Sequence, residues 1–164
     1  MTSSRRKTRP TRSAKLMTVT TLLGVLQRSF RGTADRAVGH LGISQASAWA
    51  LVIIGRQGDG ARQGVVADLL GVEGPSLIRT LDQLVGAGLV ERREDPNDRR
   101  AKTLHLTPEG LSIQEKVEAT LHALRADLFK GVTESDIDAC LRVFSALAQQ
   151  LGKADCAAFE SGAD

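Results

Sequence analysis

One segment, residues 73–88, constrains the fold more than any other, because it predicts a helix with one apolar and one polar edge. Pro75 suits the first turn of a helix, and Gly86 and Gly88 end it. Four apolar residues recur at helical spacing on one edge: Leu77, Leu81, Leu84 and Val85. Four polar residues recur on the other edge: Ser76, Arg79, Thr80 and Gln83. The polar edge lacks the Glu/Lys ladder of a solvated helix, and its side chains suit phosphates and base edges instead.

The surrounding sequence predicts further helices from its hydrophobic periodicity. In chain order we expect them over residues 16–38, 44–54, 65–70, 107–128 and 133–151. Ser44, Thr107 and Thr133 are the predicted N-caps, with Asp136 completing a capping-box-like pattern at the last helix. Apolar stripes on the first and last of these helices have no partner within the chain and therefore predict a second copy to cover them.

A polar hairpin follows the amphipathic helix. Residues 89–93 and 102–106 predict two strands, and residues 94–100 a loop between them. Arg99 and Arg100 stand side by side in this loop, where a polyanion would neutralise them, and Asp98 is placed to orient one guanidinium group. The alternative is a solvated turn, because the loop also carries Glu94 and Asp95, which balance the charge.

Charge is concentrated at one end of the chain. Residues 1–15 carry six basic side chains and no acidic one, whereas residues 16–164 carry 16 basic and 19 acidic groups. A basic arm of this kind indicates contact with a polyanion, or else a tail that serves only solubility. If it contacts phosphates of bound DNA, it steepens the salt dependence of binding.

The order of short helix, turn, polar-edged helix and basic hairpin is that of a winged helix-turn-helix. We expect a mainly α fold with a small β-hairpin wing. The expected parts are a disordered arm (1–15), an N-terminal dimerisation helix (16–40), a DNA-binding lobe (44–106), C-terminal dimerisation helices (107–152) and a flexible tail (153–164). No apolar run is long enough to cross a membrane and no secretory signal is evident, so a cytoplasmic protein with no membrane partner is expected.

Two runs make the resemblance specific. They resemble the MarR family, and in particular its SlyA branch. The family's recognition helix resembles residues 71–84 with 88–90. Its wing resembles residues 95–102, and the entry to its next helix resembles Leu106-Thr-Pro-Glu-Gly110. The resemblance implies a homodimer that binds double-stranded DNA at an inverted repeat, with half-sites about one helical turn, roughly 10 base pairs, apart. It implies a transcriptional regulator, most simply a repressor that occupies a promoter.

The resemblance also assigns roles to individual residues. It implies that Ser76, Arg79, Thr80 and Gln83 enter the major groove, with Pro75 at the helix start. It further implies that Arg100, with Arg99 beside it, enters the minor groove, and that Asp98 braces it.

Members of the family often release DNA on binding a small aromatic carboxylate or phenol. The resemblance makes Arg28 and Arg31 candidate carboxylate clamps, and Ser47 and Trp49 candidate walls of a ligand pocket. The alternatives are a purely structural Trp49 in the core, and arginines that face solvent or pair across a dimer.

No constellation of residues points to an enzyme, a metal site or a cofactor. The three histidines are far apart in sequence, and Cys140 and Cys156 match no zinc spacing. Cys140 is expected in the core of the last helix. Two other functions remain open: a ligand-independent activator that displaces a silencing protein, and a redox switch through one of the cysteines.

Overall fold

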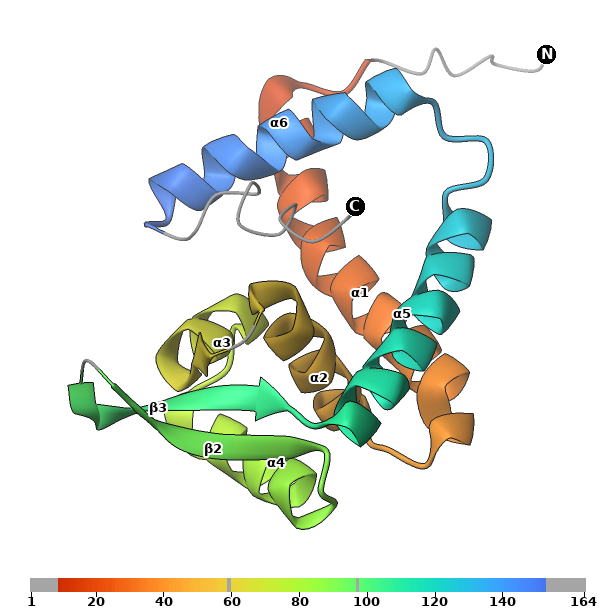
Figure 1. Ribbon diagram of the computed structural model, residues 1–164. Helices are drawn as coiled ribbons and strands as arrows, with labels where there is room; N and C mark the ends of the chain where they lie inside the picture. Colours follow the sequence, from red (N-terminus) through yellow and green to blue (C-terminus); the bar gives the residue numbers. More distant parts are fainter. Residues whose placement is uncertain (1–8, 59, 97, 153–164) are drawn as a thin grey trace, which may run out of the picture.

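A computed structural model shows the three-stranded sheet and the shorter helices gathered at the lower left, with the three longest helices above them and to their right (Figure 1). The structure describes residues 9–58, 60–96 and 98–152, and only the backbone of residues 99 and 100. The elements in chain order are α1 (Arg12–Val38), a 3-10 turn (Gly39–Leu41), α2 (Gln45–Gln57), β1 (Ala61–Arg62), α3 (Gln63–Leu70), α4 (Gly74–Gly86), β2 (Val90–Asp95), β3 (Asp98–Leu106), α5 (Pro108–Leu128) and α6 (Glu134–Gln150). The expected class, mainly α with a winged helix-turn-helix, is confirmed.

The predicted N-caps are confirmed. The side chains of Ser44, Thr107 and Thr133 accept hydrogen bonds from the backbone N–H groups of Ser47, Gly110 and Asp136. Each cap satisfies one of the N–H groups that a helix start leaves without a partner. The helices therefore begin where short polar side chains stand immediately before apolar runs.

Helix α1 begins earlier than expected. Thr11 caps it by accepting from the N–H of Ala14 at 3.2 Å, so residues 12–15 are helical and do not belong to a disordered arm. Residues 1–8 and 153–164, which include Cys156, lie outside the part of the chain that the structure describes.

The sheet has the strand order β1-β3-β2 and is antiparallel throughout. Its hairpin is longer than expected, since Glu94 still pairs with Lys102 and Asp95 with Asp98, after a register shift between Glu94 and Asp95. Backbone pairing continues through this polar stretch because ladder hydrogen bonds do not depend on side-chain polarity. The expectation of a loop over residues 94–100 is therefore wrong.

Two apolar clusters hold the chain together. One fills the lobe between α2, α3, α4 and the sheet, with Leu51, Leu81 and Leu104 fully buried. The other joins the C-terminal end of α1 to α2 and α5 through Ala34, Val38 and other buried residues. Ile43 and Ile113 pack against both clusters, so the lobe and the long helices share a continuous interior.

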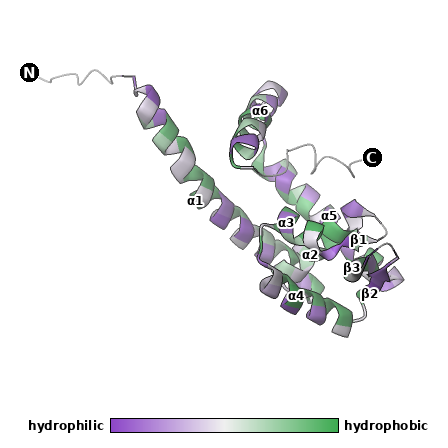
Figure 2. Ribbon diagram, turned by 90° about the vertical axis from the view of Figure 1, so that its left-hand side faces the viewer, coloured by the Kyte–Doolittle hydropathy of each residue, from purple (hydrophilic) through white to green (hydrophobic). Residues whose placement is uncertain are grey.

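The rest of α1 and all of α6 extend away from these clusters (Figure 2). Leu16, Leu22 and Leu26 on α1 are 45–61% exposed, and no residue of α6 is buried. Within residues 9–58, 60–96 and 98–152, no single helix is long and apolar enough to cross a membrane; α1 with the 3-10 turn and α2 meets that test only as a pair bent by 87°.

The start of α5 is locked onto the turn that follows α4. The N–H of Thr107 donates to the carbonyl of Leu89 at 3.1 Å, and the Thr107 hydroxyl donates to the carbonyl of Gly88 at 2.8 Å. A Cβ atom added to the buried Gly110 would lie only 1.9 Å from the carbonyl oxygen of Leu89. This contact explains why glycine stands four residues after Leu106 in the Leu-Thr-Pro-Glu-Gly run.

We therefore expect Gly110→Ala to lower the free energy of unfolding by about 3 kcal/mol or more, because two backbones must move apart. Gly64→Ala is the matched control, since Gly64 is helical and a Cβ atom added there would meet no atom within 4 Å. The control should be neutral or stabilise by up to about 1 kcal/mol. Urea denaturation measures both variants, and equal unfolding free energies would contradict this account of Gly110.

Candidate nucleic-acid interface

Helix α4 presents its polar edge to solvent. Its apolar edge is anchored in the lobe by Leu77, Leu81 and Leu84, each at most 1% exposed. Of the residues expected on the polar edge, Ser76, Arg79 and Gln83 are exposed, as is Pro75 in the first turn. Thr80 is half-buried, and its hydroxyl donates to the carbonyl of Ser76 at 3.3 Å. Val85 is 39% exposed and does not belong to the buried edge.

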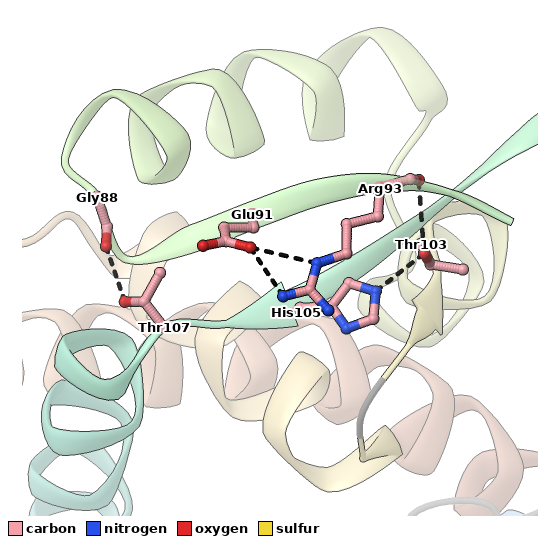
Figure 3. A network of polar contacts seen from close by, with 6 residues as sticks. All are labelled: Gly88, Glu91, Arg93, Thr103, His105 and Thr107. Carbon is pink, nitrogen blue, oxygen red and sulfur yellow. Dashed lines mark hydrogen bonds and ion pairs between the residues drawn. The ribbon is translucent and has the colours of Figure 1, made fainter.

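The pleat of the hairpin separates two faces. Glu91 lies opposite His105 and Arg93 opposite Thr103, so these four side chains share one face (Figure 3). Arg93 donates to Glu91 at 2.9 Å, and Thr103 contacts both the carbonyl of Arg93 and the Nε2 atom of His105. The other face turns Val90 and Leu104 into the lobe core. The hairpin therefore has one polar face, and the base of its other face packs into the lobe core.

Arg92 lies on the inward face, and our sequence reasoning missed it. Its guanidinium donates to Asp82 on α4 at 2.6 Å and to the carbonyl of Ile78 at 3.2 Å. Both partners belong to α4, so Arg92 ties the hairpin to that helix. The signal in the sequence was the alternation along the strand, which places Arg92 on the same side as Val90 and therefore facing inward.

The base of the wing tip holds a second ion pair that the sequence did not suggest. Asp95 is only 4% exposed and accepts from Nε of Arg62, on β1, at 2.8 Å. Asp98, predicted to brace an arginine, is exposed and pairs with Asp95 in the ladder. The side chains of Arg99 and Arg100 lie outside the described part of the chain, and their backbone belongs to β3.

A cavity of about 130 Å³ lies between α1, α2 and α4. Its lining is Arg31, Gln45, Ala46, Trp49, Leu70, Val72, Ser76, Leu77 and Thr80. Two of the four predicted pocket residues, Arg31 and Trp49, are thus brought together, and Phe30 contacts Trp49 with ring centroids 6.0 Å apart. Arg28 and Ser47 do not line the cavity: the Arg28 guanidinium lies against Gly24, and the buried Ser47 bonds to Ser44.

An ionic cluster joins the lobe to the long helices. Arg56 on α2 makes a two-pronged pair with Glu118 on α5 at 2.8 and 3.1 Å, and Arg125 lies 3.8 Å from the same carboxylate. Burial lowers the pKa of Arg125, and the charge of Glu118 opposes that effect. The cluster fixes α2 on α5 and therefore the position of the lobe relative to that long helix.

Two further expectations concern isolated side chains. Cys140 is exposed on α6 and not in a core, because no residue of that helix is buried. Among the described residues, no group of three or more His, Cys, Asp or Glu side chains is arranged to hold a metal ion.

A helix anchored by one edge, with its polar edge free and a hairpin tied beside it, defines a winged-helix DNA-binding protein. Comparison with known proteins agrees: residues 41–101 match the model of the MarR family. The transcriptional regulator PA3341 is 37% identical, with 82% of this chain and 98% of that chain covered and a TM-score of 0.76.

Two further solved structures share the fold. CouR from Rhodococcus jostii RHA1, bound to p-coumaroyl-CoA, is 26% identical over 79% of this chain and 91% of its own, with a TM-score of 0.73. A mutant of MarR from E. coli, complexed with operator DNA, is 23% identical over 84% of this chain and 99% of its own, with a TM-score of 0.70. The chain belongs to the MarR family and is a non-enzymatic, DNA-binding transcriptional regulator.

We expect Arg92→Ala to lower the free energy of unfolding by about 1–3 kcal/mol, because it removes the charged hydrogen bond to Asp82 that joins the hairpin to α4. The same variant should bind DNA more weakly although Arg92 faces inward. Arg93→Ala, one residue away, is the control: its pair with Glu91 is more than half exposed on both sides and contributes little. Thermal denaturation should show a larger loss of stability for Arg92→Ala than for Arg93→Ala. An equal loss in both variants would contradict the role of Arg92 in holding the hairpin on α4.

Proposed function

We propose that the protein is a homodimeric repressor of the SlyA-like branch that occupies an inverted-repeat operator and releases it on binding a small aromatic acid or phenol. The observation that carries the DNA-binding mode is the free polar edge of α4 beside a tethered wing. Ser76, Arg79 and Gln83 are exposed on one edge, where they can reach base edges and phosphates in a major groove. Repression follows most simply from occupying a promoter.

The dimer is supported by apolar surface on the two terminal elements. The exposed apolar side chains of α1 and α6 are Leu16, Met17, Val19, Leu22, Leu23, Val25, Leu26, Leu141, Val143 and Phe144. Monomeric proteins rarely expose contiguous apolar patches of this extent. In our proposal a second copy covers both helices, and the two-fold symmetry of the dimer matches that of an inverted repeat.

The wing supplies the flanking contact in this proposal. Arg100, with Arg99 beside it, reaches the minor groove, and Asp98 braces the pair. The rigid ladder that extends to residue 98 supports this role, because it carries the tip away from the lobe on a paired strand.

The ligand site we propose is the cavity between α1, α2 and α4. A cavity of about 130 Å³ has the size that holds a single aromatic ring, since an apolar cavity of about 150 Å³ accommodates benzene. Arg31 supplies a carboxylate clamp, and Trp49 with Leu70 supplies the apolar wall. The aromatic acyl compound bound to CouR makes an aromatic acid a reasonable class of effector.

The position of this cavity provides the coupling. Ser76 and Thr80 line the cavity and also belong to the predicted DNA-contacting edge of α4. In our proposal, a ligand there touches residues of this edge and favours an arrangement of α4 that fits the groove less well. It shifts the equilibrium only by the difference in its affinity for the two arrangements.

For DNA binding, we expect Arg79→Ala to reduce discrimination between operator and scrambled duplex by about 1–3 kcal/mol for each base that Arg79 reads. Fluorescence anisotropy with DNA from upstream of the protein's own gene measures both affinities. Arg36→Ala on α1, an exposed arginine outside α4 and the wing, should leave the ratio unchanged. Equal losses of affinity on both duplexes for Arg79→Ala would make Arg79 a phosphate-binding residue.

For ligand response, we expect salicylate to weaken operator binding by the wild-type protein. Arg31→Gln should raise the salicylate concentration needed by about 10- to 100-fold, because a charged hydrogen bond of roughly 1.5–3 kcal/mol is lost. Arg28→Gln removes the same charge three residues away, outside the cavity, and should respond like the wild type. If Arg28→Gln and Arg31→Gln behave alike, the proposed clamp is wrong.

A further inference from the structure

The N-terminal end of α1 lies far from the recognition helix. Of this 27-residue helix only Ala34 and Val38, near its C-terminal end, are buried. At 1.5 Å per residue, Arg12 stands roughly 33 Å along the helix from Ala34. Both views place this end of α1 at the opposite side of the molecule from α4 and the wing (Figures 1 and 2).

That end is also the most basic part of the chain. Residues 1–34 contain eight basic side chains and no acidic one, and the first acidic residue is Asp35. The structure describes Arg9, Arg12 and Lys15 as exposed, and the first turn of α1 contains no acidic residue. Among the described ion pairs none involves these three side chains. Their charge is therefore available to a partner.

Two-fold symmetry does not bring this charge to the operator. The axis that relates two half-sites of an inverted repeat is perpendicular to the duplex. Rotation about that axis keeps each α1 pointing away from the DNA in both subunits. Arg12 and Lys15 are held in the helix, so they stay on the far side while α4 occupies its groove.

We propose that the basic end of α1, formed by Arg9, Arg12 and Lys15, binds a second DNA duplex, so that an operator-bound dimer bridges two DNA segments. The inference rests on the proposed dimeric mode of operator binding. It replaces the expectation that the arm adds contacts to the same duplex.

Charge and location favour DNA as the partner. The three described basic groups per chain, six in a dimer, suit the regular phosphate array of a duplex, and no acidic residue stands among the first 34 residues of the sequence. A regulator seated on its operator has neighbouring duplex at high effective concentration, which compensates for weak, sequence-independent contacts. The residues from 35 to 164 are net acidic, with 14 basic and 19 acidic groups, so the second contact depends on this end.

The test is a capture experiment with the full-length protein. Operator duplex from upstream of the protein's own gene is fixed to beads, loaded with protein and washed, and a fluorescent duplex of scrambled sequence is then added. We expect the wild type to retain the second duplex, and retention to fall as salt rises with a log–log slope of about 0.9 per phosphate contact.

Charge-removing variants locate the contact. Arg9→Gln, Arg12→Gln and Lys15→Gln together should reduce capture severalfold, and adding Arg5→Gln, Arg6→Gln and Lys7→Gln should reduce it by about tenfold or more. Operator affinity, measured separately by anisotropy, should change less than twofold. The control combines Arg36→Gln, Lys116→Gln and Lys130→Gln, which removes three exposed charges elsewhere and should capture like the wild type.

Each other outcome overturns a distinct claim. Operator binding without capture of a second duplex by the wild type overturns the bridging inference and leaves the proposed function intact. Parallel loss of operator affinity and capture in the six-fold variant places the arm on the operator itself. Retention of phosphatidylserine–phosphatidylcholine vesicles in place of the second duplex makes the partner a membrane surface. Failure of the wild type to bind the operator overturns the proposed function.

Discussion

The anchoring of α4 by three leucines is the constraint on which the proposed DNA-binding surface depends. Leu77, Leu81 and Leu84 are buried in the lobe core, and exposing any one of them costs about 1.5–3 kcal/mol. The helix therefore cannot rotate about its axis without a large loss of stability. Because the apolar edge is fixed, Ser76, Arg79 and Gln83 must face outward. The direction of the polar edge is thus a consequence of hydrophobic burial on the opposite one.

Further contacts join α4 to the neighbouring elements. Arg92 joins the hairpin to α4, and the close approach of Gly110 to Leu89 joins α5 to the turn after α4. Glu118 then ties α5 to α2 through Arg56. Packed backbone and paired charges therefore connect the long helices to α4. In the proposed mechanism, a ligand in the cavity acts on a helix that these contacts hold in place.

Much of the fold could be predicted because its signals are local. Helix positions follow from apolar spacing, and Ser44, Thr107 and Thr133 cap helices as predicted. The polar edge of α4 was predictable for the same reason, except for Val85 and the half-buried Thr80, which lie at the borders between the edges. The spacing of apolar residues predicts which side of a helix is buried, but it does not predict the burial of residues at the border between the two edges.

The features that were missed depend on contacts between distant segments. Strand β1 has two residues and forms only because Ala61 and Arg62 meet β3. The Arg92–Asp82 and Arg62–Asp95 pairs join residues 10 and 33 positions apart. Arg28 and Arg31 look equivalent in sequence, yet only Arg31 lines the cavity, because Arg28 stands almost one turn nearer the N-terminus of α1, with its guanidinium against Gly24. Cys140 was expected in a core that one chain alone does not form.

Selection of binding sites from random duplexes tests the central claim most directly. The purified protein is allowed to enrich its own targets, which are sequenced and then footprinted with hydroxyl radicals. A dimer that places two anchored recognition helices in successive major grooves should recover an inverted repeat with half-sites about 10 base pairs apart. The footprint should show two protected patches with that spacing. Recovery of a single unrepeated site, or of no preferred sequence, would contradict the account.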